Sequence, residues 1–297
     1  MVATRHGSAE RSDCQRTVAV GYRLGVPLKY VTVESVATLV HHTGPTTLPG
    51  SPPDTTKGRT VLCLHDAGGN GSQFTGVLEA LAEKHSPVAY DQPGHGRSAT
   101  LDSLGDIAKM ASHVRLLSDA LGLRAPVLLG VGMGAAVAIE AAVADPSWAS
   151  ALILCGGAGL RCDVDDDAVT KMRRIAGGKA RREFDQTGYA PGTPREVFGK
   201  AFAEWVKTDP RATVGDLVAM QAWTATGRLA AVTCPTLVVV GEHETDAARA
   251  AATALADALP DGRTVKLAGA ARNGVVEQPA ALAAVVDQLR VTTGAQA

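Results

Sequence analysis

Residues 126–144 read PVLLGVGMGAAVAIEAAVA. The run Pro126–Leu129 is short and apolar, which is typical of a buried strand, and the glycines from Gly130 to Gly134 predict a tight turn after it. The alanine-rich stretch 135–144 predicts a helix that ends at Asp145-Pro146, because a residue before proline disfavours helical backbone. A strand, a tight turn and a helix in this order form the repeating unit of an α/β protein.

The same alternation continues on both sides of this unit. We expect two short strands within 30–40, further strands at 60–64, 88–90, 151–154, 235–240 and 264–267, and helices at 107–121, 247–259 and 279–290. Residues 158–228 interrupt the alternation, because they are polar, charged and helical in pattern. The sequence therefore predicts an α/β fold with a mostly parallel, doubly wound sheet and an inserted helical cap.

Three parts of the chain follow from this pattern. We expect an N-terminal extension at 1–28 that is partly disordered, a core made of 29–157 and 229–297, and a helical cap at 158–228. In parallel sheets ligands bind at the carboxyl ends of the strands, so the loops that follow the strands are the places to look for a site.

The composition excludes several classes of function. Lys plus Arg number 29 and Asp plus Glu number 30, so no basic excess indicates nucleic acid. The N-terminus has no apolar signal core and no apolar run is long enough to span a membrane. The five cysteines are odd in number and lack metal-ligand spacing. We therefore expect a cytoplasmic protein without a metal, a cofactor, a nucleic-acid partner or a membrane partner.

Four motifs occur in a characteristic order. They are His65 with its glycine-rich loop, Asp91-Gln-Pro-Gly-His-Gly-Arg-Ser98, Pro235-Thr-Leu-Val-Val-Val-Gly241 and Glu277-Gln-Pro279. Together they resemble the α/β-hydrolase superfamily over about residues 29–290, in particular bacterial enol-lactonases and carbon–carbon bond hydrolases with a helical cap. The resemblance implies the α/β-hydrolase fold and a site between core and cap.

The catalytic residues of that family are replaced. The family presents its nucleophile on a G-x-S-x-G elbow, and here Gly132 stands at the nucleophile position. Arg272 stands at the position of the histidine base, and a guanidinium stays protonated and cannot accept a proton. The acid position is Glu244, with Asp246 close by. We expect Arg272 to form an ion pair with Glu244 or Asp246.

The loop that would supply the oxyanion hole also departs from the family. The resemblance implies His-Gly where this chain has His65-Asp66. The backbone N–H groups of Ala67 and Met133 are expected to converge on one spot, and a carboxylate beside it would repel a developing oxyanion. The His-Asp-x-Gly loop and the Gly-Val-Gly-x-Gly-Ala elbow also resemble the N-myc downstream-regulated family, which has this fold without hydrolase activity.

Two other motifs have simpler interpretations. The spacing of Gly130, Gly132 and Ala135 matches a dinucleotide-binding turn, but Cys155-Gly-Gly stands where that motif needs an acidic residue. Residues 163–167 resemble the start of a calcium loop, but Ala168 stands where glycine is required. We interpret this acidic stretch as the N-cap and first turn of a helix.

The remaining candidates are His65 and Cys155, which we expect to contact a substrate. Cys155 could also be a nucleophile, but no histidine matches it, and a buried, inert thiol is favoured. We expect Ser72 to cap the helix after the oxyanion loop. His41 and His42 are expected on a surface hairpin without a role.

Three hypotheses about function follow. The first is a non-hydrolytic enzyme of lyase, isomerase or cyclase type that acts on a small organic substrate, either neutral or anionic, with Asp66 for proton transfer and Arg272 for anion binding. The second is a catalytically inactive pseudohydrolase that binds a ligand or a partner. The third is hydrolysis by relocated groups, either Cys155 or a water molecule activated by Asp66. A small-molecule ligand or substrate is the expected partner.

Overall fold

The computed structural model describes residues 26–45, 47–48 and 51–289. Most of the expected N-terminal extension, at 1–25, lies outside the described residues, as does the stretch 290–297. None of the helices in the described ranges is long and apolar enough to cross a membrane.

Eight strands form one sheet in the order β1-β2-β4-β3-β5-β6-β7-β8. They are β1 (Leu28–Val33), β2 (Val36–His42), β3 (Thr60–Leu64), β4 (Ser86–Tyr90), β5 (Val127–Val131), β6 (Ala151–Cys155), β7 (Thr236–Gly241) and β8 (Gly262–Leu267). The pairs β1–β2 and β2–β4 are antiparallel, and every other pair is parallel. The expected mostly parallel, doubly wound sheet is confirmed.

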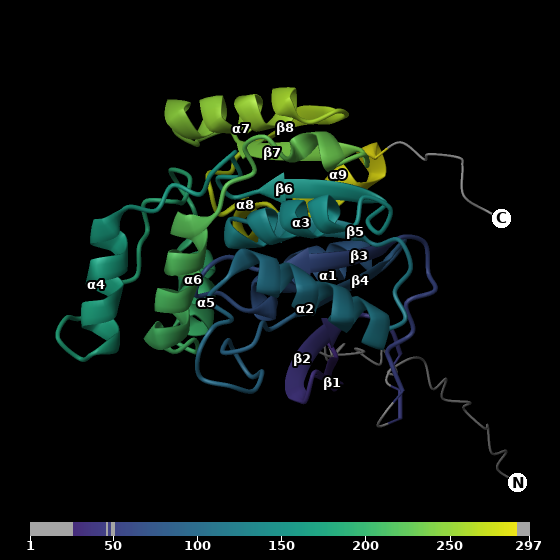
Figure 1. The fold of residues 1–297 in the computed structure, drawn as a ribbon, viewed down its shortest axis with the longest axis horizontal. Helices are drawn as coiled ribbons and strands as arrows, with labels where there is room; N and C mark the ends of the chain where they lie inside the picture. Colours follow the sequence, from purple (N-terminus) through teal and green to yellow (C-terminus); the bar gives the residue numbers. More distant parts are fainter. Residues whose placement is uncertain (1–25, 46, 49–50, 290–297) are drawn as a thin grey trace, which may run out of the picture.

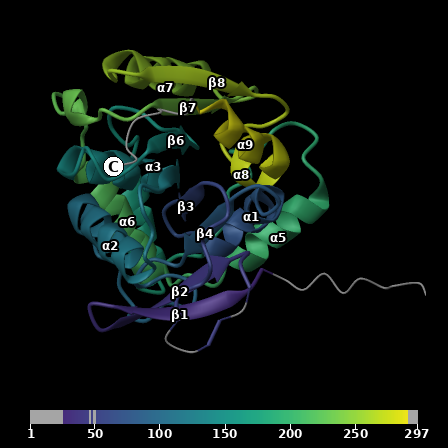
Figure 2. The same cartoon turned by 90° about the vertical axis from the view of Figure 1, so that its right-hand side faces the viewer.

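The helices lie on both faces of the sheet (Figures 1 and 2). They are α1 (Thr75–Leu81), α2 (Ile107–Ala120), α3 (Met133–Ala144), α4 (Asp166–Ala176), α5 (Arg195–Trp205), α6 (Pro210–Ala222), α7 (Asp246–Ala258), α8 (Gly274–Glu277) and α9 (Pro279–Val285), with short 3-10 turns η1 (Gly71–Phe74), η2 (Leu229–Ala231) and η3 (Val286–Gln288). Helices α2, α3 and α7 pack on one face, and α1 and α9 pack on the other.

Side chains at the helix starts fix where several helices begin. The Asp165 carboxylate accepts the N–H of Ala168 at the start of α4, so the acidic stretch at 163–167 includes an N-cap, as expected. Asn70, and not Ser72, caps η1: its side chain accepts the N–H of Ser72. The expectation for Ser72 is wrong because the chain turns into the 3-10 helix earlier than the sequence pattern indicates.

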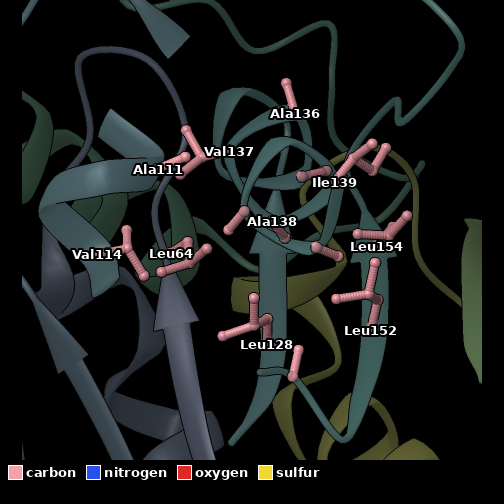
Figure 3. Packing of buried hydrophobic residues seen from close by; sticks show 14 of the residues in the cluster. Leu64, Ala111, Val114, Leu128, Ala136, Val137, Ala138, Ile139, Leu152 and Leu154 are labelled. Carbon is pink, nitrogen blue, oxygen red and sulfur yellow. The ribbon is translucent and has the colours of Figure 1, made fainter. Parts of the chain in front are cut away.

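The central strands are buried on both faces, and α3 lies directly over them. Figure 3 shows Ala138 and Ile139 of α3 with Leu128 and Leu152 of the strands, all within one apolar cluster. Alanines let the helix backbone approach the sheet closely, and each fully buried leucine contributes about 1.5–3 kcal/mol. This packing holds the turn between β5 and α3 in a fixed position.

The strand β2 lies deeper than expected. Residues 40–42 pair with β4, and this pairing buries His41 and His42. The Nε2 atom of His41 lies 2.9 Å from Oδ1 of Asp91. The expectation that both histidines are on the surface is therefore wrong.

Three helices, α4, α5 and α6, lie between β6 and β7 in the chain, and we refer to them as the helical insertion. Figure 1 shows them together at one end of the sheet. The hydroxyl of Thr208, before α6, donates to the carbonyl oxygen of Gly69, and the Asn70 amide donates to the carbonyl oxygen of Glu204. The insertion therefore contacts the loop that follows β3.

Candidate functional site

Gly132 lies at the turn between β5 and α3, where the elbow would present a nucleophile. Its backbone has φ 53° and ψ −112°, a conformation that residues with a side chain rarely adopt. Its N–H donates to the carbonyl oxygen of Cys155 at 2.9 Å, which holds the turn against β6. A Cβ atom added at Gly132 would overlap the carboxyl group of Asp66. The space for a nucleophile is thus filled by a side chain from another loop.

Asp66 follows β3, and its carboxylate lies at the start of α3. Its Oδ1 atom accepts the N–H of Ala67 at 2.8 Å and the N–H of Met133 at 2.8 Å. These are the two donors expected to converge as an oxyanion hole, and Oδ1 is the atom on which they converge. Met133 is the first residue of α3, so the helix dipole adds to the attraction for a negative charge. The chain's own carboxylate occupies this pair of donors.

Arg272 lies in the loop after β8 and faces the other oxygen of the same carboxylate. Its Nη2 atom is 3.6 Å from Oδ2 of Asp66. The guanidinium lies beside Gly157, where an added Cβ atom would contact it at an ordinary van der Waals distance of 3.5 Å. The Arg272 and Asp66 side chains are 47% and 26% exposed, and such a partly solvated pair contributes about 0–1 kcal/mol.

The expected ion pair of Arg272 with Glu244 or Asp246 is wrong. Asp246 begins α7 and pairs with Arg249, three residues further along the same helix, at 2.5 Å. Glu244 turns back on its own loop, where its Oε1 accepts the N–H of Gly241 at 3.1 Å. Burial raises the pKa of the Glu244 carboxyl. Local partners thus take both carboxylates away from Arg272.

The structure does not bring His65 to the surface of the site. His65 is fully buried, its Nδ1 donates to the carbonyl oxygen of Asp66 at 2.9 Å, and its Nε2 accepts the N–H of Gln92 at 3.0 Å. Burial, together with the nearby charge of His95, lowers the pKa of His65 to about 4. His65 is therefore a neutral ring that holds the Asp66 loop from behind.

Cys155 is also buried. Its thiol lies 3.4 Å from the carbonyl oxygen of Gly130 and donates to it, and burial raises its pKa. Neither Cys155 nor His65 lines the cavity described below. The expectation that these two residues contact a substrate finds no support in their positions.

A second buried carboxylate, Asp216 on α6, was not predicted from the sequence. Its Oδ2 accepts the N–H of Gly68 at 2.8 Å and lies 2.7 Å from Nε2 of His95, and its Oδ1 accepts the hydroxyl of Ser103 at 2.6 Å. Nδ1 of His95 lies 3.1 Å from the carbonyl oxygen of Pro93, so both ring nitrogens donate and the ring is charged.

This buried pair connects the helical insertion to the site loops. Both side chains are 0% exposed. Burial opposes the charge on His95, but the Asp216 carboxylate outweighs it and raises the His95 pKa. A single aspartate in a helix usually faces solvent, which is why spacing alone could not identify this one.

A small cavity lies between α3, the helical insertion and Arg272. Its wall includes Gly132, Ala135, Ile139, Cys162, Met220 and Arg272. The centre of a water molecule can occupy only about 20 Å³ of it, which is room for one or two waters. Within the described ranges, no three His, Cys, Asp or Glu side chains are placed to share a metal ion.

Comparison with known proteins agrees with the fold. Residues 61–285 match the model of the "Alpha/beta hydrolase family". The chain is 29% identical over 221 residues to "Putative carbamate hydrolase RutD" of Variovorax paradoxus, which covers 69% of this chain and 81% of that protein. The "enol-lactonase from Burkholderia xenovorans LB400" has a similar structure, with a TM-score of 0.71, 20% identity, and coverage of 88% of this chain and 98% of that one.

Another relative is much longer than this chain. "Polyketide synthase ThaQ" of Burkholderia thailandensis is 27% identical over 251 residues, which is 79% of this chain but 12% of that protein. The match therefore concerns one segment of a large protein.

Proposed function

Because the chain belongs to the alpha/beta hydrolase family, we propose that it keeps the family's site but not its serine-dependent hydrolysis. It acts instead on a small organic molecule as a non-hydrolytic enzyme of lyase, isomerase or cyclase type. The observation that carries this proposal is the position of Asp66, whose carboxylate holds both donors of the oxyanion hole. Asp66 and Arg272 are the charged groups at the oxyanion-hole and base positions of the site.

Hydrolysis through a tetrahedral intermediate needs a negative oxygen bound by these two donors. Here Oδ1 of Asp66 already accepts both N–H groups, and an oxyanion beside it would be repelled in a site of low dielectric. Gly132 has no side chain to attack a carbonyl carbon. Two separate requirements of acyl transfer are thus unmet.

Relocated hydrolysis has less support. The Cys155 thiol is buried, its pKa is raised, and it lies off the cavity. A thiol in this state supplies little thiolate, which is the nucleophilic form.

We infer that the helical insertion serves as a cap over this site. The insertion contributes Met220 and Trp223 to the cavity wall, and the segment before α4 contributes Cys162 and Asp163. A small, partly apolar space lined by the Arg272 cation and the Asp163 carboxylate, with Asp66 beside Gly132 of its wall, suits a small organic molecule.

A second candidate is a pseudohydrolase that binds a ligand without turning it over. The small cavity favours it, because room for one or two waters leaves little space for a substrate to react.

Ester cleavage tests the loss of hydrolysis. We expect the purified protein to release p-nitrophenolate from p-nitrophenyl acetate no faster than a protein-free blank. The control variant Asp257→Asn, whose change lies on the exposed side of α7, should give the same rate. The triple variant Asp66→Gly, Gly132→Ser, Arg272→His frees the hole and restores the family's nucleophile and base, and we expect it to gain activity. Saturable cleavage by the unmodified protein would refute the proposal.

Mass spectrometry then separates the enzyme from the binder. The protein is incubated with a metabolite extract, and compounds that disappear are quantified. Consumption well beyond the molar amount of protein indicates an enzyme, and the mass change gives the reaction class. Depletion that stops at one equivalent, with recovery after denaturation, indicates the ligand-binding alternative.

A further inference from the structure

The two oxygens of the Asp66 carboxylate have different surroundings. Oδ1 accepts two backbone hydrogen bonds. Oδ2 has no hydrogen-bond donor within reach among the described residues, and its charged neighbour is the Arg272 guanidinium at 3.6 Å. The side chain is 26% exposed and Oδ1 anchors the group, so Oδ2 is the oxygen left to contact a small molecule.

Arg272 is free to bind an oxygen of such a molecule. Its guanidinium lines the cavity together with Gly132, and its contact with Asp66 is longer than a hydrogen bond. Because a guanidinium remains protonated, it can stabilise a negative oxygen but cannot remove a proton. An anchored base oxygen therefore lies beside a cation that is free to bind a substrate oxygen.

We propose that Asp66 and Arg272 enolise a small carbonyl compound, with Oδ2 of Asp66 as the base and Arg272 as the group that binds the enolate oxygen. This inference rests on the proposed non-hydrolytic function and names its reaction and substrate class. A C–H bond next to the carbonyl breaks, its proton moves to Oδ2, and its electron pair forms the new C=C bond. The carbonyl π electrons move to the oxygen, which accepts an N–H of Arg272. Return of the proton to carbon completes an exchange or an isomerisation.

The spacing of the two groups suits this step. In a carbonyl compound the α-carbon and the oxygen are about 2.4 Å apart. A base oxygen and an arginine nitrogen 3.6 Å apart can contact both atoms of such a fragment at about 3 Å each. No co-reactant other than water is needed: carbon takes back a proton from Oδ2, and the Oδ2 proton can first exchange with solvent because the Asp66 side chain is partly exposed.

Other titratable groups at the cavity are poorer bases. Cys162 lines the cavity, but burial raises its pKa to about 12, so it holds its proton near neutral pH. Asp163 lies on the rim, where it is exposed. Among the cavity-lining groups and Asp66, Oδ2 is thus the oxygen that is both anchored and adjacent to a cation.

Cavity size and charge narrow the substrate class. The cavity is small and partly open to solvent, which favours a compound with few heavy atoms that is only partly enclosed. Asp66 and Asp163 together carry more negative charge than Arg272 offsets, which favours an uncharged compound over a carboxylic acid. Small ketones and hydroxyketones fit both limits.

Deuterium exchange tests the proposal without knowledge of the natural substrate. Acetone, hydroxyacetone and pyruvate are each incubated with the protein in D₂O, and loss of the α-proton signals is followed by NMR. We expect exchange of hydroxyacetone above the protein-free rate and less effect on pyruvate. Asp66→Asn should lower the protein-dependent rate by about 100-fold or more, and Arg272→Gln by about 10-fold or more. The Asp257→Asn control should retain it.

The outcomes are separable. Circular dichroism and thermal melting establish that each variant is folded. No exchange of any of the three compounds, or exchange that persists in Asp66→Asn, overturns the enolisation proposal. If the protein then still fails to cleave esters and consumes a metabolite, the non-hydrolytic function stands on its own. Saturable ester cleavage would instead remove the function on which the proposal rests.

Discussion

At the scale of single residues, Asp66 and Gly132 depend on each other. The Asp66 carboxylate fills the volume that any side chain at 132 would need, and the positive φ at Gly132 already disfavours such a side chain. A serine introduced at 132 alone would therefore push Asp66 out of the hole and would not recreate a hydrolase. This is why the restored variant proposed above also removes the Asp66 side chain.

The dependence can be measured as a coupling energy. Gly132→Ala adds backbone strain both in the unmodified protein and in the Asp66→Gly variant. The new Cβ atom overlaps the carboxyl group only when Asp66 is present. We expect Gly132→Ala to destabilise the protein by about 1–3 kcal/mol more with Asp66 than in an Asp66→Gly background. Urea unfolding of the four proteins of this cycle gives the number. Additive effects of the two changes would contradict the overlap.

At the scale of elements, α6 is fixed to the site by a buried charge pair. Asp216 accepts donors from the loop after β3 and from the turn that contains His95. Removing one partner of such a pair leaves an uncompensated buried charge, whereas an exposed aspartate contributes little. The helical insertion therefore depends on one side chain for its alignment with the Asp66 loop.

An amide at this position tests that dependence. Asp216→Asn removes the negative charge beside the buried His95 ring, and we expect a loss of about 3–5 kcal/mol of unfolding free energy. The matched change Asp257→Asn removes an equal charge from an exposed site and should cost under about 0.5 kcal/mol. Faster hydrogen exchange at the Gly68 amide should accompany the loss. Equal stabilities of the two variants would show that the buried pair does not hold the insertion.

At the scale of the whole molecule, the fold could be predicted because its signals are local. Short apolar runs, glycine turns and helical periods alternate along the chain, and each can be identified within about ten residues. The eight-stranded sheet and the elbow at Gly132 follow from them.

The pairings within the site could not be predicted in the same way. Arg272 and Glu244 stand at the family's base and acid positions, which the resemblance implies are paired in space. Here Glu244 instead accepts the N–H of Gly241, and the charged neighbour of Arg272 is Asp66. His41 is buried because β2 pairs with β4, a contact between residues far apart in sequence. Such outcomes depend on which partner is nearest after folding, and sequence spacing does not encode this.

The whole molecule should lose stability in acid because of histidines buried in neutral form. Burial lowers the pKa of His113 to about 4 from an ordinary value of 6.5, and the pKa of His65, also through the charge of His95, to about 4. Between pH 4 and pH 6.5 these histidines bind protons in the unfolded chain but not in the folded chain. The free energy of unfolding therefore decreases as pH is lowered from about 6.5 to 4. The raised pKa of His95 acts in the opposite sense, since its contribution is present at low pH and is lost as pH rises through its folded pKa.

Replacing one of these histidines measures its contribution to the pH dependence of stability. His113 has no hydrogen-bond partner for Nε2 among the described residues, so His113→Leu removes a buried polar atom and a site of proton uptake together. The difference in unfolding free energy between pH 7 and pH 4 should shrink by about 3 kcal/mol relative to the unmodified protein, since one pKa unit corresponds to about 1.4 kcal/mol. Denaturant unfolding at both pH values measures this difference for each protein. Carboxylates that titrate in both proteins contribute equally, so their effect is removed when the two differences are compared. An unchanged difference would mean that His113 takes up its proton without unfolding, through an opening of α2 that lets water reach the ring.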